Sequence, residues 1–330
     1  MIRLLLIPVV LFGVLRVLIL CVPTVAQWFM PLPWPYSLLQ HATVHLLAIQ
    51  TVVFLVLLVL PSRRSWLSMS LMTLLAACII TNIQPLIPYY IPQAYSSPQN
   101  QTFKLVTLNL HGKTNHNVEA TEEFIRQTQP DILCFSEQTP FWDNALTNSE
   151  ALKPYPHHIQ GTAHLSLYSK FPINKHRFLH ARPNPSLVNE TAMVADVMVH
   201  QTPVTLLIAH PPLPMPQKYE QLEFKQINNW IKHYQQGEFH PHLILAGDLN
   251  TTPYAKQFQL ILSGMQLNDT QWGQGLQPSW PAKFGPVGIP IDHVLVSHQL
   301  QTIARHTGVN LGTDHLPVIV TLGLYAKTSS

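Results

Sequence analysis

The sequence has 330 residues, enough for one large domain and an accessory region. Residues 1–100 contain four Arg and no acidic residue, whereas residues 101–330 contain the other 15 of the 19 Lys and Arg and all 16 Asp and Glu. The second part is therefore nearly neutral and lacks the basic stripe of a protein that grips a nucleic-acid duplex through many phosphates. Its single cysteine, Cys134, excludes an internal disulfide scaffold.

Three apolar stretches near the beginning of the chain are each long enough to cross a bilayer as a helix, which needs about 20 apolar residues. They predict a three-helix transmembrane region over residues 1–94, with the lipid bilayer as its partner. The predicted spans cover about residues 4–22, 38–60 and 66–87. A polar linker is predicted next, at residues 95–102.

Arginines give the membrane region its direction. Arg3 and the pair Arg63 and Arg64 are expected on the cytoplasmic side, because short loops that carry Lys or Arg stay inside. Three crossings from a cytoplasmic N-terminus then place the rest of the chain outside a bacterial inner or plasma membrane, in the periplasm or the cell exterior. Arg16 weakens the first span, and residues 1–26 are alternatively a cleaved signal peptide, which gives the same final side.

Beyond the linker, short apolar strands alternate with helices. Strands are predicted at residues 103–110, 131–135, 163–168, 192–199, 204–209, 242–246, 293–296 and 317–322, and helices at 118–128, 217–234 and 255–262. Many strands with few helices favour layered sheets with helices packed outside, an α/β sandwich.

Several of these strands are ended or followed by a polar residue that can bind phosphate or a metal ion. Taken singly, each also fits a turn or a strand cap, but their joint occurrence favours a site, because a rigid sheet presents functional residues at its ends. Asp248 and Asn250 stand two apart and share one side if the backbone stays extended. The full set is Asn109, Glu137, His210, Asp248, Asn250, Asp292, Asp314 and His315.

Six short segments contain or flank these residues, in the order LNLH, SEQTP, AH, GDLNTTP, IDHVLVS and TDHLPV. In this order they resemble the endonuclease/exonuclease/phosphatase superfamily over about residues 101–325. The resemblance implies a catalytic domain at residues 103–325, built as a four-layered α/β sandwich with its site at one end of two packed sheets. It also implies a metal-dependent phosphoester hydrolase that uses Mg²⁺, with Mn²⁺ as a substitute.

The resemblance implies a metal site around Glu137, whose carboxylate is the hard oxygen ligand that Mg²⁺ prefers. Asn109 is expected to support the metal and phosphate side, and Asp314 to contribute to metal binding. His111 stands where some family members have Asp, so the resemblance assigns it no role.

Five further residues receive catalytic roles from the same resemblance. Asp248 is expected to orient or deprotonate the attacking water, with Asn250 holding the phosphate or Asp248 itself. His210 and His315 are expected at the phosphate, and Asp292 is expected to orient the imidazole of His315. Whether the base is Asp248 or a histidine stays open.

The resemblance leaves two substrate classes open. Family members that act on apurinic DNA have Tyr at the position of His210, and the residues after Asn250 and around Asp292 differ from those of inositol 5-phosphatases. The membrane spans and the neutral charge favour a phospholipid-derived phosphoester, and a nuclease acting on DNA is the alternative.

A catalytically silent interaction module is a further alternative, disfavoured because Glu137, Asp248 and His315 are all present. No protein partner is predicted.

Overall fold

The chain forms two compact units, Met1–Pro88 and Tyr89–Ser330. The computed structural model describes residues 21, 24–25, 34, 36–59, 66–93, 101–162, 164–180 and 191–325. Tyr89 already belongs to the second unit, ahead of the linker expected at residues 95–102.

The described part of the first unit is mainly helical. Its described helices are η1 (Tyr36–Ala42), α2 (Thr43–Val59), α3 (Trp66–Ile83) and η3 (Gln84–Leu86), and α4 (Ile87–Tyr90) leads into the second unit. Two helical stretches within the described residues are long and apolar enough to cross a membrane, Ser37–Val59 and Ser68–Tyr90. They match the second and third expected spans. The first expected span, residues 4–22, lies outside the described residues apart from Cys21.

The second unit contains two six-stranded sheets, each with parallel and antiparallel neighbours. In order across the first sheet lie β11 (Leu300–Thr307), β12 (Val318–Leu324), β1 (Thr102–Asn109), β2 (Ile132–Ser136), β4 (Leu165–Ser169) and β3 (His157–Thr162). Across the second sheet lie β5 (Ile173–His180), β6 (Thr191–Val199), β7 (Thr202–Ile208), β8 (His242–Asp248), β10 (Asp292–Ser297) and β9 (Leu267–Asp269).

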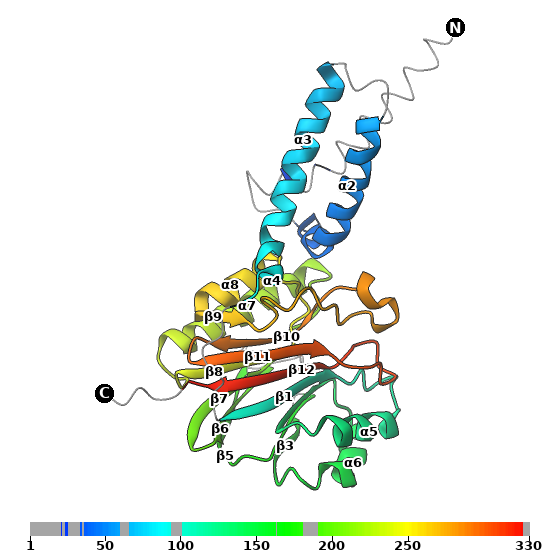
Figure 1. The fold of residues 1–330 in the computed structure, drawn as a ribbon. Helices are drawn as coiled ribbons and strands as arrows, with labels where there is room; N and C mark the ends of the chain where they lie inside the picture. The colour runs from blue at the N-terminus through cyan, green and yellow to red at the C-terminus, as the bar shows by residue number, and fades with distance from the viewer. Residues whose placement is uncertain are drawn as a thin grey trace. The chain divides into compact units, whose positions relative to one another are not determined.

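Helices cover both outer faces of the sheet pair (Figure 1). Apolar side chains of α5 (Val118–Thr128) and α6 (Pro140–Thr147) pack on the first sheet. Those of α7 (Gln217–Gln235) and α8 (Lys256–Met265) pack on the second. A third apolar cluster fills the space between the sheets, so the predicted four-layered α/β sandwich is confirmed. Two short helices, η4 (Glu150–Leu152) and η6 (Ala282–Val287), lie in connections.

Central strands are apolar on both faces because each face meets a packed layer. In β1, Phe103 and Leu105 enter the core between the sheets, whereas Val106 and Leu108 enter the core under α5 and α6. Successive side chains of a strand point to opposite faces, so burial of both faces requires a nearly continuous apolar run. Such runs are what the sequence displays at the central strands.

Sequence reasoning missed four strands, and all four are sheet edges: β3, β5, β9 and β11. An edge strand has one hydrogen-bonded neighbour, and its other side lies free of the sheet, so it needs no continuous apolar run. β5 illustrates this, since its sequence INKHRFLH contains a single buried residue, Leu179. Helix α6 was also missed, because eight residues that begin at Pro140 give little periodic signal.

Strand directions bring the polar strand ends together. β1 runs parallel to β2, and β7 runs parallel to β8, so the ends of each pair lie side by side. β10 runs antiparallel to β8, which sets its first residue, Asp292, opposite the last residue of β8, Asp248. β12 runs antiparallel to β1, so the residues just before β12 return to the end of β1.

Candidate active site

Asn109, the last residue of β1, links the two sheets at the end where their polar strand ends meet. It is almost fully buried, and its Nδ2 donates to Oε1 of Glu137 at 3.0 Å and to Oδ2 of Asp248 at 2.9 Å. Its Oδ1 accepts the backbone N–H of His111 at 2.8 Å. The amide therefore holds two carboxylates with its donors, while its oxygen is engaged by the backbone.

Glu137 follows β2 in a left-handed backbone conformation, with φ of 54°, which is uncommon for a residue with a side chain. This turn is locked by Gly112, whose N–H donates to the Glu137 carbonyl oxygen at 3.2 Å. A Cβ on Gly112 would lie 2.4 Å from that oxygen, so only glycine fits there. Gly112 is a supporting residue that sequence reasoning missed, although its place just after LNLH was a signal.

His210 and Asp248 face one another across the ends of β7 and β8. Nε2 of His210 lies 3.5 Å from Oδ2 of Asp248 and 3.6 Å from Oε1 of Glu137. Burial acts to lower the pKa of His210, but the two carboxylates outweigh it and raise that pKa above its ordinary value. The imidazole is thus biased towards its protonated, positively charged form.

Asp248 is the most connected carboxylate of the site. Besides Asn109 and His210, it faces Nε2 of His315 at 3.7 Å. Burial acts to raise the pKa of Asp248, yet the charges of His315 and His210 and the Asn109 amide hold it well below its ordinary range. Asp248 is therefore ionised and accepts hydrogen bonds only.

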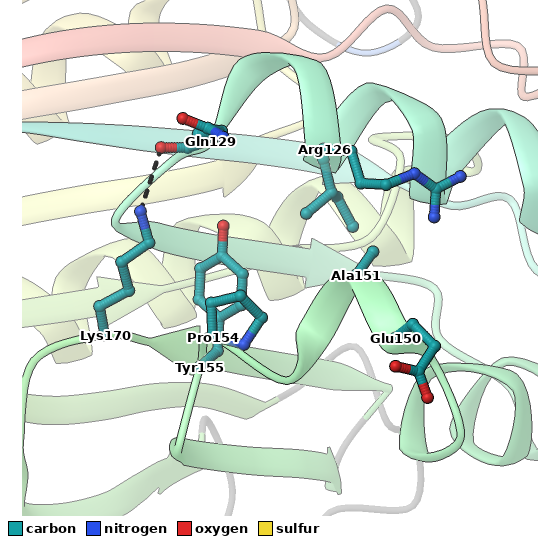
Figure 2. A pocket seen from close by; sticks show the side chains of 8 residues that line it. Arg126, Gln129, Glu150, Ala151, Pro154, Tyr155 and Lys170 are labelled. Carbon is teal, nitrogen blue, oxygen red and sulfur yellow. Dashed lines mark hydrogen bonds between the residues drawn. The ribbon is translucent and has the colours of Figure 1, made fainter.

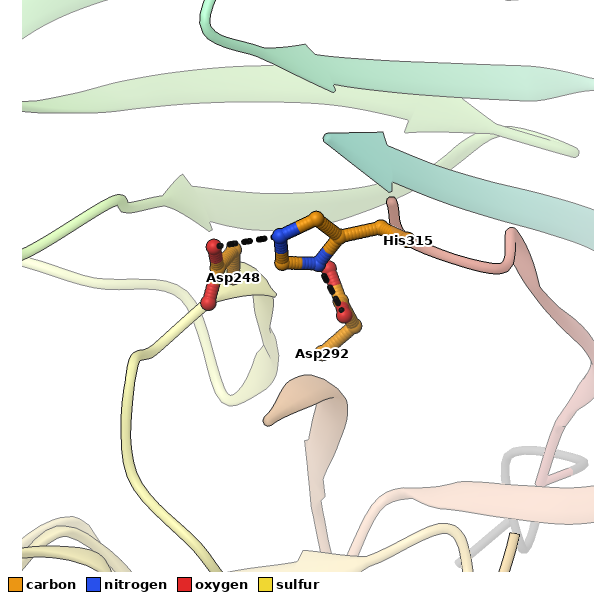
Figure 3. Close-up of side chains that lie close together, drawn as sticks. All are labelled: Asp248, Asp292 and His315. Carbon is orange, nitrogen blue, oxygen red and sulfur yellow. Dashed lines mark hydrogen bonds and ion pairs between the residues drawn. The ribbon is translucent and has the colours of Figure 1, made fainter. Parts of the chain in front are cut away.

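Asp292 and His315 form a close, buried pair (Figure 3). Oδ2 of Asp292 and Nδ1 of His315 lie 2.8 Å apart, and both side chains are buried. Burial acts to lower the pKa of His315, but Asp292 and Asp248 raise it to about 10. Burial raises the pKa of Asp292, against the opposing charge of His315. The two carboxylates thus favour the protonated form of His315, which suits charge stabilisation.

Asp314 and His111 lie at the edge of the same cluster. Oδ1 of Asp314 lies 2.8 Å from Nδ1 of His111 and 3.8 Å from Nε2 of His315. The indole N–H of Trp280 donates to Oδ2 of Asp314 at 2.9 Å. His111, whose role the sequence left open, is therefore a partner of Asp314, and Trp280 is a further residue of the site.

Asn250 departs from the geometry expected from its spacing. Its φ is 51°, so the segment from Asp248 to Asn250 is not extended, and the condition on which both side chains were expected to share one side is not met. The backbone N–H of Asn250 donates to Oδ1 of Asp248 at 2.9 Å, and its Nδ2 donates to the carbonyl oxygen of Pro211 at 2.9 Å. Asn250 therefore fixes Asp248 through its backbone and anchors the segment after His210 through its side chain.

Two sets of groups in this cluster can bind a metal ion. Asp248, Asp292 and His315 each have a ligand atom within 4.8 Å of the others, and all three are buried. Both ring nitrogens of His315 already face carboxylates there. The side chains of Glu137 and Asp314 are instead 31% and 39% exposed, although Oδ1 of Asp314 is itself buried, and carboxylate oxygens are the ligands that Mg²⁺ prefers. The donor chemistry at the exposed side of the cluster therefore fits a hard divalent cation.

A hollow of about 480 Å³ lies near the beginnings of β1 and β2, away from these residues (Figure 2). It is lined in part by Arg126, Glu150, Tyr155 and Lys170. Lys170 donates to the carbonyl oxygen of Gln129, and the Tyr155 hydroxyl donates to that of Pro130. These groups are committed to structural contacts and include no paired carboxylate and imidazole.

The sequence profile of the Endonuclease/Exonuclease/phosphatase family matches residues 106–315. No curated protein sequence matches the chain significantly. Among solved structures, an endonuclease/exonuclease/phosphatase from Beutenbergia cavernae DSM 12333 is 19% identical, with 68% of this chain and 72% of that one covered and a TM-score of 0.55. Truncated TDP2 from Caenorhabditis elegans is 16% identical, with 69% and 100% covered and a TM-score of 0.56.

TDP2 from D. rerio, solved in complex with a single strand DNA product, is 14% identical, with 67% of this chain and 99% of that one covered and a TM-score of 0.54. At these identities the structural likeness is one of fold. The matched profile spans every candidate residue from Asn109 to His315.

Proposed function

The chain belongs to the endonuclease/exonuclease/phosphatase family of metal-dependent phosphoester hydrolases, and on that basis we propose that it is a membrane-anchored, Mg²⁺-dependent phosphodiesterase. The observation that carries the proposal is an unbroken series of carboxylates and imidazoles across the joined sheet ends. Consecutive members lie 2.8–3.8 Å apart, in the order Glu137, His210, Asp248, His315, Asp314 and His111. This series provides acidic groups for a cation and cationic groups for a phosphate within one cluster.

Glu137 and Asp314 are the residues proposed to hold Mg²⁺, with Asn109 supporting Glu137 through its 3.0 Å hydrogen bond. When bound, the cation would polarise the phosphate oxygens and offset their negative charge. Four carboxylates, Glu137, Asp248, Asp292 and Asp314, face two imidazoles whose pKa values are raised. The resulting excess of negative charge supports the binding of a divalent cation.

Asp248 is proposed to orient the attacking water. It is ionised, buried and fixed by Asn109 and by the backbone N–H of Asn250, so its position is set before a substrate binds. Preorganised acceptors of this kind direct a water without the cost of rearrangement. The low pKa of Asp248 makes it a weak proton acceptor, which supports a role in orientation more than in complete deprotonation.

His210 and His315 are proposed to contact the phosphate. Both are biased towards the protonated state, and their Nε2 atoms flank Asp248 at 3.5 and 3.7 Å. Two N–H donors with positive charge stabilise the negative charge that develops on a phosphate oxygen during in-line displacement. Asp292 orients His315 through its 2.8 Å contact with Nδ1 and is proposed as a positioning residue.

Membrane anchoring and the extracytoplasmic side are parts of the same proposal. Two apolar helices with Arg63 and Arg64 between them support a cytoplasmic loop and the delivery of Tyr89–Ser330 to the outside. A cytoplasmic N-terminus further requires the first expected span, residues 4–22, with Arg3 inside. A tethered, nearly neutral domain favours a substrate at the membrane, so a phospholipid-derived phosphodiester is the leading substrate class. Nucleic acid is the second class, since the family includes nucleases.

The test is Mg²⁺-dependent hydrolysis by the full-length protein in detergent, run in parallel on bis-p-nitrophenyl phosphate, phospholipids including sphingomyelin, and plasmid DNA. Asp248→Ala and His315→Ala are each expected to lower turnover by about 10²- to 10⁴-fold. Asp196→Ala and His240→Ala form a matched control. Oδ2 of Asp196 and Nε2 of His240 lie 3.7 Å apart, the same distance as in the Asp248 and His315 pair, but they belong to strand and loop positions outside the site. The controls are expected to retain turnover.

Turnover confined to lipid would support the leading substrate class, and turnover confined to DNA would replace it with the nuclease. An absence of turnover on every substrate with both Mg²⁺ and Mn²⁺ would overturn the proposed function.

A further inference from the structure

Residues 89–93, which comprise the end of the second apolar helix and the residues after it, are built into the second unit. Tyr89 is 2% exposed, and its carbonyl oxygen accepts the N–H of Gly275 at 2.7 Å. Gly273 adopts φ of 76°, and a Cβ there would lie 3.0 Å from the carbonyl oxygen of Ile91 and from the N of Gln93. Residues 89–93 therefore pack closely against the loop that follows β9.

The Tyr89 side chain reaches a buried carboxylate. Its hydroxyl donates to Oδ2 of Asp269 at 3.1 Å, and the N–H of Gln271 donates to Oδ1 at 2.9 Å. Asp269 is 3% exposed and ends β9. Burial raises the pKa of Asp269, and the charge of Arg305 opposes that rise. The carboxylate is thus held by two hydrogen bonds, one of which comes from Tyr89.

Arg305 is itself 3% exposed and crosses from β11 of the first sheet to β10 of the second. Its Nη2 donates to the carbonyl oxygen of Asp292 at 3.3 Å, and its Nη1 donates to Oε1 of Gln277 at 2.5 Å. Burial lowers the pKa of Arg305, and the charges of Asp269 and Asp292 oppose that fall. The contacts that fix the guanidinium are its hydrogen bonds to Gln277 and to the Asp292 carbonyl oxygen.

Tyr89 therefore anchors the loop after β9 at Asp269 and at Gly275. Gln277 of that loop accepts from Arg305, which in turn donates to the carbonyl oxygen of Asp292. We propose that Arg305, held in place by Gln277 in the loop that Tyr89 anchors, is a positioning residue for the Asp292 and His315 pair, so that the functional catalytic domain begins at Tyr89. The inference rests on the proposed function. It assigns the end of the membrane-attached helix a direct part in the geometry of the site.

A spectroscopic signature tests the inference independently of turnover. The Nδ1 proton of His315, shared with Asp292 across 2.8 Å, is expected to give a far-downfield proton resonance in the full-length protein in detergent. The resonance is assigned by its loss in Asp292→Asn. Tyr89→Phe, which removes only the hydroxyl bonded to Asp269, and Arg305→Gln are each expected to shift or broaden it.

The matched control is Tyr155→Phe, which removes a buried hydroxyl donating to the Pro130 carbonyl oxygen at 2.7 Å, away from the site. This substitution removes one hydrogen bond, comparable with the one that Tyr89→Phe removes, and is expected to leave the resonance unchanged. In the kinetic arm, Tyr89→Phe is expected to lower kcat about tenfold with little change in KM, as loss of an outer-shell partner does in metal sites. Tyr155→Phe is expected to leave both constants unchanged.

An unaltered resonance in both Tyr89→Phe and Arg305→Gln, or equal effects of Tyr89→Phe and Tyr155→Phe, would overturn the inference. So would the absence of the resonance from the wild-type protein, since the pair would then lack the geometry described. If no variant and no wild-type sample hydrolyses any substrate, the proposed function fails, while the resonance still decides whether Tyr89 and Arg305 position the pair.

Discussion

His315 shows how burial and charge compete at one side chain. Burial favours the neutral ring, but carboxylates lie 2.8 Å from Nδ1 and 3.7 Å from Nε2, and they raise the pKa of His315 to about 10. The raised pKa therefore comes mainly from partners that are 23 and 67 positions away in the sequence, with a smaller contribution from the adjacent Asp314. Its identity could be inferred from the TDH segment, whereas its protonation state required the tertiary contacts.

Glu137→Gln tests the proposed metal site at the residue scale. We expect the Mg²⁺ concentration for half-maximal hydrolysis of bis-p-nitrophenyl phosphate to rise about tenfold, because a neutral amide oxygen is a weaker ligand than a carboxylate. The measurement is the initial rate against added Mg²⁺ after removal of metal with a chelator. Glu150→Gln is the control, since Glu150 pairs with Lys153 at the surface. Identical Mg²⁺ curves for Glu137→Gln and wild type would exclude Glu137 as a ligand.

At the scale of elements, the site depends on close approach between the ends of neighbouring strands. Gly247 in β8 has φ of 142°, and a Cβ there would lie 2.0 Å from the carbonyl oxygen of Ala209. Asp248 and His210 follow these two residues directly. The absence of a side chain at position 247 is thus what allows the two catalytic candidates to face one another.

Gly247→Ala is expected to lower the free energy of unfolding by about 1–3 kcal/mol or more and to reduce turnover, because both the backbone conformation and the contact with Ala209 disfavour a side chain. Thermal unfolding followed by circular dichroism measures the first effect. Gly237→Ala separates the two causes, since Gly237 has φ of 72° but no atom within 4 Å of the added Cβ. Equal losses in the two variants would show that the contact with Ala209 contributes nothing.

The packing of α7 against α8 contains a buried acid. Glu223 is fully buried, with Gln257 of α8 beside it, and burial followed by the charge of Glu220 raises its pKa well above the ordinary value of 4.5. Because the folded-state pKa is the higher one, the contribution of Glu223 to stability is complete below about pH 4.5 and is lost as the pH rises through the folded-state pKa.

Glu223→Gln is therefore expected to be more stable than wild type at about pH 8, with the difference shrinking towards about pH 4. Thermal midpoints measured at both pH values test this sign. Glu238→Gln, which alters a partly exposed acid paired with Arg177, controls for the general loss of one negative charge. A difference between Glu223→Gln and wild type that is constant with pH would contradict the raised pKa.

At the scale of the whole molecule, the proposed orientation makes a prediction about compartments. Alkaline phosphatase fused after Ser330 is expected to be active in a bacterial host, and the same reporter fused next to Arg64 is expected to be inactive, because arginine-bearing loops remain in the cytoplasm. The opposite pattern would place the second unit inside the cell. The mass of the mature protein separates three spans from a cleaved signal peptide of about 26 residues, since only cleavage removes the N-terminus.

The sequence by itself determined the layered fold and the kinds of residue in the site. Central strands such as β1 and β8 are buried on both faces, so their apolar runs are visible, and the polar residue that ends each run stands out against them. The edge strands β3, β5, β9 and β11 were not predictable in this way, because strands with one neighbour tolerate polar residues.

Only the tertiary structure decided which groups pair. Asp248 meets Asn109, His210 and His315 through strand order and register, and those long-range contacts leave no local mark on the sequence. Tyr89, Asp269 and Arg305 lie in segments that gave no functional signal, yet folding buries them together. The physical reason is that pKa values and hydrogen bonds depend on distance and burial, which the chain acquires only when its two sheets pack.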